Sequence, residues 1–177
     1  MDVTPAVSKV GFGATITALV VDPDGNVVDR REGHNLMTAV GLTAIAQALM
    51  WSGVEDVADS IGVTGPLYLA PVWGAVGTGS TTPVSTLTAL VAETTRAAVT
   101  SAGYSGAVGA GSASTTFLFF IPGPITSWAL TEAGLFASAA STPGSGTLLD
   151  YFQFSPTLNV VAPNSLVLQA TFAVAEA

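Results

Sequence analysis

The sequence predicts a mainly β protein, an antiparallel β-sandwich of jelly-roll or Ig-like type with one packed α-helix. Three observations predict this fold class. Short apolar runs recur at short intervals between Gly- and Pro-rich turns, and they do not alternate with long helices. Only one segment has a strong helical pattern. Apolar residues make up 49% of the 177 residues, which is enough to build a core.

Residues 1–33 are predicted to form an N-terminal hairpin and a possible attachment element. Residues 13–21 alternate as a strand, residues 23–26 (PDGN) carry a turn signal, and residues 27–31 return as a second strand. Asp29, Arg30 and Arg31 are placed where an edge strand carries charge against pairing with other chains.

Residues 34–177 are predicted to form the β-sandwich domain, with a helix near residues 38–52. Thr38 is the expected N-cap, and Gly53 lies just past the expected C-terminal end. The helix has one narrow apolar face, formed by Val40, Ala44, Ile45, Ala48 and Leu49.

The rest of the chain reads mostly as strands and turns. We expect strands at residues 67–76 (interrupted by a proline), 96–101, 115–121, 128–136, 147–154 and 165–173. We expect a short helix at residues 85–93, a loop at residues 103–114 and a connection at residues 156–164.

Charge excludes several function classes. Only 9% of residues are charged, against about 25% in an average domain, and four Lys and Arg stand against twelve Asp and Glu. Binding to nucleic acid through phosphates needs more cations, so no nucleic-acid partner is expected. No apolar run is long enough for a spanning helix, so no membrane partner is expected.

The low charge also points to assembly. A surface in which 37 Ser and Thr replace charges is poorly protected against self-association. We therefore expect a homo-oligomer whose subunit contacts lie in the β-rich half, because residues 97–177 contain only three charged side chains.

Metal, cofactor and catalytic sites are not predicted. The chain has no cysteine and one histidine, His34, which we read as a polar loop residue. The acidic stretch of Glu55, Asp56 and Asp59 lacks calcium-loop spacing and is read as a solvated face.

Two carboxylates and one cation form the main candidate cluster. A buried carboxylate must be paired or neutralised. Arg96 is the only cation in the second half of the chain, so Glu93, Arg96 and Glu132 are predicted to form a structural salt-bridge network. A less favoured alternative is a hydrolase that uses Glu93 and Glu132 as a carboxylate pair.

Trp73 and Trp128 are possible interaction aromatics. Aromatic side chains can form a sugar-binding platform, so a carbohydrate-binding, receptor-recognition module is the alternative function. Single aromatics on sandwich strands are more often part of the core.

Several short motifs occur in a recognisable order, and together they resemble small virion structural proteins of tailed bacteriophages. The motifs lie at residues 35–38 (NLMT), 77–83 (GTGSTTP), 90–96 (LVAETTR) and 132–136 (EAGLF). The resemblance implies a non-enzymatic protein that decorates a capsid or belongs to a tail fibre or collar. It further implies a location in the virion after assembly in the bacterial cytoplasm, and partners that are copies of itself, with a trimer favoured, and other virion proteins.

Overall fold

The computed structural model describes residues 10–43, 71–106, 111–124, 126–137 and 140–176. Nine strands lie in these residues: β1 (Val10–Val21), β2 (Val27–His34), β3 (Leu36–Met37), β4 (Trp73–Gly77), β5 (Glu93–Gly106), β6 (Ser112–Ile121), β7 (Trp128–Ala137), β8 (Thr147–Val160) and β9 (Ser165–Glu176).

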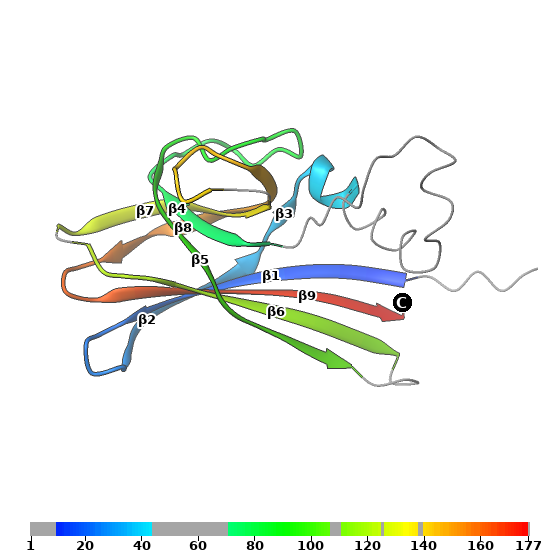
Figure 1. The fold of residues 1–177 in the computed structure, drawn as a ribbon, viewed down its shortest axis with the longest axis horizontal. Helices are drawn as coiled ribbons and strands as arrows, with labels where there is room; N and C mark the ends of the chain where they lie inside the picture. The colour runs from blue at the N-terminus through cyan, green and yellow to red at the C-terminus, as the bar shows by residue number, and fades with distance from the viewer. Residues whose placement is uncertain (1–9, 44–70, 107–110, 125, 138–139, 177) are drawn as a thin grey trace, which may run out of the picture.

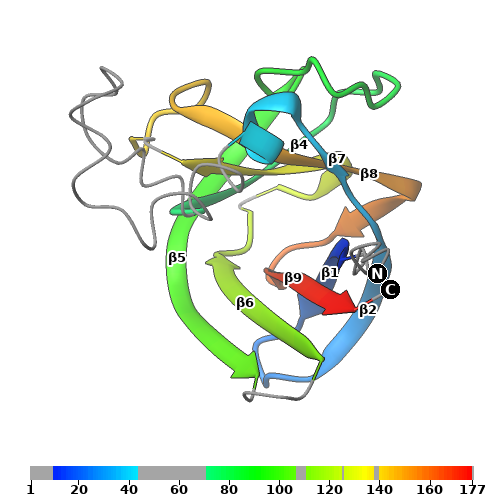
Figure 2. The same ribbon diagram turned by 90° about the vertical axis from the view of Figure 1, so that its right-hand side faces the viewer.

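The strands form one antiparallel sheet in the order β2-β1-β9-β6-β5-β4-β7-β8-β3. The sheet curls into a half-barrel, which is seen end-on in Figure 2. Its two edge strands, β2 and β3, are separated along the chain by Asn35 alone, so one short stretch of chain supplies both edges. The prediction of a mainly β, antiparallel fold is confirmed.

Strand β5 connects the two halves of the sheet. Its first residues pair with β4, from Glu93 to Ala98, and its later residues pair with β6. The register shifts between Val99 and Ser101, and a bulge of this kind bends a strand. The bend turns the β1-β9-β6 half to face the β4-β7-β8 half (Figure 1).

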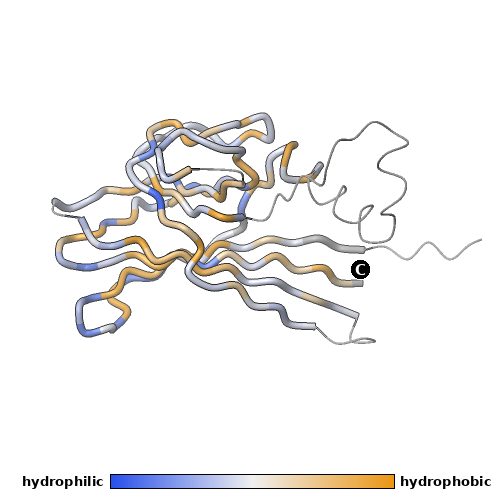
Figure 3. Tube along the Cα trace, viewed as in Figure 1, coloured by the Kyte–Doolittle hydropathy of each residue, from blue (hydrophilic) through white to orange (hydrophobic). Residues whose placement is uncertain are grey.

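The space between the two halves holds the main core. It is filled by side chains from β1, β4, β6, β7, β8 and β9, among them Ile16, Phe119, Leu135, Phe154 and Leu168. In Figure 3 these strands are mostly orange where the halves face each other. Burial of apolar surface at about 25 cal/mol per Å² is the main force that holds the halves together.

The leading hairpin forms as predicted and is part of the sheet. Asp22 accepts the backbone amide of Asn26 at 2.8 Å, and Gly25 takes a φ of 88°, which L side chains rarely adopt. Strand β2 lies at the sheet edge, as its charges predicted. Strand β1 also pairs with β9 along its whole length.

The predicted helix begins where expected. Residues 39–43 are helical, and the Thr38 hydroxyl accepts the backbone amide of Gly41 at 3.1 Å. The same hydroxyl donates to the carbonyl of Leu148 at 2.7 Å, which ties the helix start to β8. The remainder of the predicted helix, residues 44–52, and Gly53 lie outside the described residues, as do residues 67–70 of the next predicted strand.

The predicted short helix at residues 85–93 is wrong. Those residues form turns and bends before β5 starts at Glu93. The backbone amides of Val91 and Ala92 donate to the carboxylate of Glu132, and this long-range contact replaces helical hydrogen bonds.

Two predicted connections are also wrong, because strands occupy much of them. Strand β5 runs on to Gly106 and β6 starts at Ser112, although this stretch contains mostly small residues. Strand β8 runs through Pro156 to Val160. Pro156 lies in the register shift opposite Leu130 and Glu132, and a bulge tolerates a residue without an N–H.

Candidate functional site

Glu132 is a fully buried carboxylate that binds backbone amides. Its Oε1 accepts the amides of Ala92 at 2.8 Å and Gly79 at 3.0 Å. Its Oε2 accepts the amide of Val91 at 3.1 Å and the hydroxyl of Tyr151 at 3.2 Å. One side chain on β7 therefore holds both ends of the 79–92 connection against the sheet.

The packing around Glu132 requires glycine. A Cβ on Gly79 would lie 2.5 Å from Oε1 of Glu132, and a Cβ on Gly77 would lie 2.6 Å from the same oxygen. Burial, followed by the charge of Glu132 and the hydrogen bond to it, raises the pKa of Tyr151 to about 12. The Tyr151 hydroxyl therefore remains a hydrogen-bond donor at neutral pH.

Glu93 and Arg96 form a separate ion pair on β5. Nε of Arg96 lies 2.5 Å from Oε1 of Glu93, and a second guanidinium nitrogen lies 2.7 Å from Oε2, in a bidentate arrangement. The side chains are 1% and 5% exposed, for Arg96 and Glu93 respectively. The guanidinium also lies over the ring of Phe136, 4.7 Å from its centroid.

This ion pair holds the turn between β7 and β8. Arg96 donates to the carbonyls of Ala140 at 3.1 Å and Ser145 at 3.0 Å, and Glu93 accepts the amide of Gly144 at 2.9 Å. The ion pair therefore fixes a turn that is distant in sequence from β5.

The predicted network of three residues is thus two separate arrangements. In the sheet, Gly77 of β4 lies between Glu93 on β5 and Glu132 on β7. The carboxylate of Glu132 is stabilised by amide and hydroxyl donors and has no ion pair among the described residues. Both carboxylates accept hydrogen bonds from groups of the same chain, so the contacts described for them are structural.

Asp150 is a buried carboxyl group of a different kind. It is fully buried on β8, opposite Met37 and Leu135, and within the described residues neither oxygen has a hydrogen-bond partner of ordinary geometry. Burial raises the pKa of Asp150 to about 8, and the backbone amide of Tyr151 acts in the opposite direction with a smaller effect. The side chain of Asn35, just before β3, is likewise buried without a partner among those residues.

The sequence carried a signal for Asp150 that the prediction did not use. Leu148, Leu149, Tyr151 and Phe152 surround it, so the segment is apolar on both faces and a carboxyl group there must be buried.

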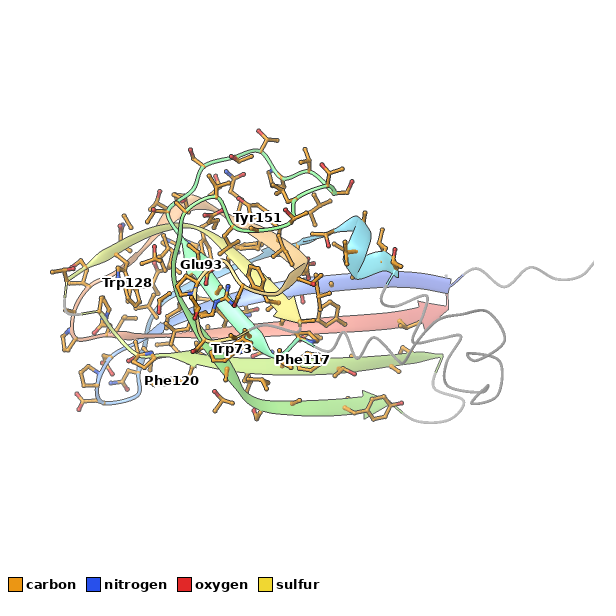
Figure 4. The ribbon with its side chains drawn as sticks, turned by 45° about the horizontal axis from the view of Figure 1, so that its top comes forward. Trp73, Glu93, Phe117, Phe120, Trp128 and Tyr151 are labelled. Atoms are coloured by element: carbon orange, nitrogen blue, oxygen red, sulfur yellow. The ribbon has the colours of Figure 1, made fainter. Side chains whose placement is uncertain are left out.

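The two candidate tryptophans do not come together. Trp73 starts β4 and packs against a small cluster that contains Phe136, and Trp128 starts β7 and packs against the main core. Figure 4 shows them in different parts of the molecule. Since Trp73 pairs in register with Phe136, near the far end of β7 from Trp128, the two rings do not form one platform.

Four strand ends form an extension that we call the arm. It consists of residues 10–14 of β1, 171–176 of β9, 112–116 of β6 and 100–106 of β5, and it projects beyond β4, β7 and β8 (Figure 1). The described side chains of the arm, those of residues 13–14, 100–106, 112–116 and 171–175, are small or hydroxylic with a few larger exceptions. Among these exceptions, Phe172 packs edge-on against Phe117 of β6, and Tyr104 is 72% exposed. Residues 100–106 and 112–116 of the arm contain no charged residue, and the saturated blue of charged residues is absent from these two strand ends in Figure 3.

The remaining candidate residues lie outside the described part of the structure. His34 is the last residue of β2, but its side chain is outside the described residues, and so are Glu55, Asp56 and Asp59. Within the described residues, no group of three or more His, Cys, Asp or Glu is placed to hold a metal ion. No helix among them is long and apolar enough to cross a membrane.

Comparisons of this chain with protein-family models, with curated proteins and with solved structures found no match.

Proposed function

We propose that this chain is a non-enzymatic structural component of a tailed-phage virion that binds and stabilises a capsid or tail surface. Its partners would be copies of itself and other virion proteins, and its location would be the virion, after assembly in the bacterial cytoplasm. The resemblance of its ordered motifs to small virion proteins supports the proposal. The same resemblance favours a trimer.

The observation that carries the proposal is the arm. A four-stranded extension that has no charged side chain on residues 100–106 or 112–116 is unusual for a protein that works alone, because exposed strands are normally protected by charge. Such an extension is suited to permanent contact with other subunits.

The arrangement of the motifs adds a second argument. The glycines at residues 77–79, the amides of Val91 and Ala92, and Glu132 come from three of the four motifs, and they meet around one carboxylate. Residues of these motifs therefore hold the 79–92 connection against the sheet, and a scaffold for surface contacts needs such internal cross-connections.

We also propose that the two facing halves of the sheet act as the two layers of a β-sandwich. Residues from both halves share one core, and the bulge in β5 and the break at Asn35 would be its corners.

Electron cryomicroscopy of purified particles tests the proposed function. We expect density that fits this fold at fixed symmetry-related positions on the capsid or tail. Particles that are washed, still infectious and free of the chain by mass spectrometry would rule the proposal out.

A further inference from the structure

Strand β2, at one edge of the sheet, and the end of β5 that extends beyond β4 carry very different residues. Strand β2 has four consecutive charged residues, and within them Arg30 pairs with Glu32 and Arg31 pairs with Asp29. Charge of this kind prevents a second chain from adding to an edge. Strand β5 has no charged residue from Ala97 to its end at Gly106.

The edge of β5 becomes open at a defined point. Strand β4 pairs with β5 up to Ala98, and the amide of Val99 donates to the carbonyl of Val72 at 2.9 Å. The preceding residue, Pro71, has no N–H to donate and interrupts the ladder. Among the described residues, nothing pairs with this side of β5 from Thr100 to Gly106, and residues 101–106 are all exposed.

We propose that this edge, residues 100–106, pairs with the same edge of a second copy of the chain. The two β5 strands would run antiparallel around a two-fold axis at Gly103 and would join two arms into one eight-stranded sheet. The inference deepens the proposed function and rests on it for the expectation that copies of the chain meet. It makes a dimer the basic unit, in place of the trimer that the resemblance favours.

The residues of this edge are complementary to themselves. A two-fold axis at Gly103 puts Ser101 opposite Ser105 of the second copy and Ala102 opposite Tyr104 of the second copy. Small residues allow close backbone approach, and no like charges meet across the axis. Each Tyr104 ring, now 72% exposed, would cover the Ala102 methyl group of the second copy.

The chain suits a cross-linking test because it contains no cysteine. A Cβ added at Gly103 meets no atom within 4 Å, so Gly103→Cys is expected to fold. Directly opposed residues of an antiparallel pair have Cα atoms about 4.5–5.5 Å apart, within the range that a disulfide spans. Gly13→Cys is the matched control, because Gly13 is also exposed on the arm with open space around it.

Under mild oxidation we expect Gly103→Cys to form a covalent dimer and Gly13→Cys to remain largely uncrosslinked. Equal cross-linking of both variants would overturn the proposal. Cross-links found only in a mixture of the two variants would also overturn it, because β5 would then pair with β1 of the next copy.

A charge at the axis provides the second measurement. Light scattering after size exclusion should give the mass of two chains for the wild type and for Gly13→Lys, and the mass of one chain for Gly103→Lys. A trimer or a monomer of the wild type contradicts the proposal. If the wild type is a monomer and its amides at residues 101–106 resist hydrogen exchange, the edge pairs with another segment of the same chain and the proposal is wrong.

The two proposals can fail separately. If the chain is a dimer in solution but is absent from particles, the proposed β5 pairing is supported and the proposed virion function is wrong. The opposite result is a chain that is monomeric in solution, is found on particles and stays on them when it carries Gly103→Lys. That result supports the proposed virion function and shows that the proposed β5 pairing is wrong.

Discussion

The hydroxyl of Tyr151 on β8 donates to the carboxylate of Glu132 on β7 at 3.2 Å, inside the protein, where three backbone amides bind the same carboxylate. The sheet register places Tyr151 opposite Gly134, so the hydrogen bond is diagonal across the two strands. The hydrogen bond therefore links β8 to the carboxylate on β7 that holds residues 79–92 against the sheet.

Tyr151→Phe should destabilise the protein by about 1.5–3 kcal/mol, because it removes one donor from a buried charged acceptor. Urea denaturation at neutral pH measures the effect. Tyr104→Phe is the control, because that ring is 72% exposed, and its free energy of unfolding should be unchanged. Equal stability of Tyr151→Phe and the wild type would show that the contact has no energetic role.

The contacts of Glu132 also show what the sequence could and could not predict. The rule that a buried carboxylate needs a partner correctly predicted that Glu132 would be hydrogen-bonded inside the protein. The rule did not say which partner, and the nearest cation in the sequence was the wrong choice. The partners are amides some 40 and 53 positions away, at Ala92 and Gly79, and a single sequence carries no pattern for such contacts.

Strand prediction succeeded where hydrophobic side chains carry the pattern. Residues 115–121, 128–136, 147–154 and 165–173 all lie within observed strands. It failed at residues 103–106, where mostly small residues give no alternation and only pairing with β6 determines the strand. It failed again at Pro156, because a bulge accommodates a residue that normally ends a strand.

Asp150 should make stability depend on pH. Its pKa is about 8 in the folded protein and 3.8 for the unperturbed group, so between these values the folded state keeps a proton that the unfolded state has released. Stability from this group is therefore lost as pH rises, at up to about 1.4 kcal/mol per pH unit, and the loss ends above pH 8.

The difference between wild type and Asp150→Asn isolates this effect, because other titrating groups cancel. We expect Asp150→Asn to gain stability relative to wild type between pH 6 and pH 8 in urea denaturation. A difference in unfolding free energy that does not change over this range would mean that Asp150 is ionised in the folded protein.

Arg96→Ala should destabilise the protein by about 3–5 kcal/mol, because it leaves the buried carboxylate of Glu93 without its cation. Arg30→Ala is the control: it removes an ion pair whose side chains are 61% and 54% exposed, and it should cost less than about 1 kcal/mol. A double variant, Glu93→Gln with Arg96→Met, should lose less stability than the sum of the losses of Glu93→Gln alone and Arg96→Met alone, since it removes both charges. Additive losses would show that the two side chains act independently.

Trp128→Ala should reduce stability by on the order of 2–4 kcal/mol, because the ring packs against the main core. Thermal unfolding measures this loss, and Val161→Ala, which changes a 53% exposed apolar side chain, is the control. The same proteins should be compared on a glycan array. A Trp128→Ala variant that keeps its stability but loses binding to a sugar would contradict the core role and favour a carbohydrate-binding function, because a ring that only packs in the core does not contact a sugar.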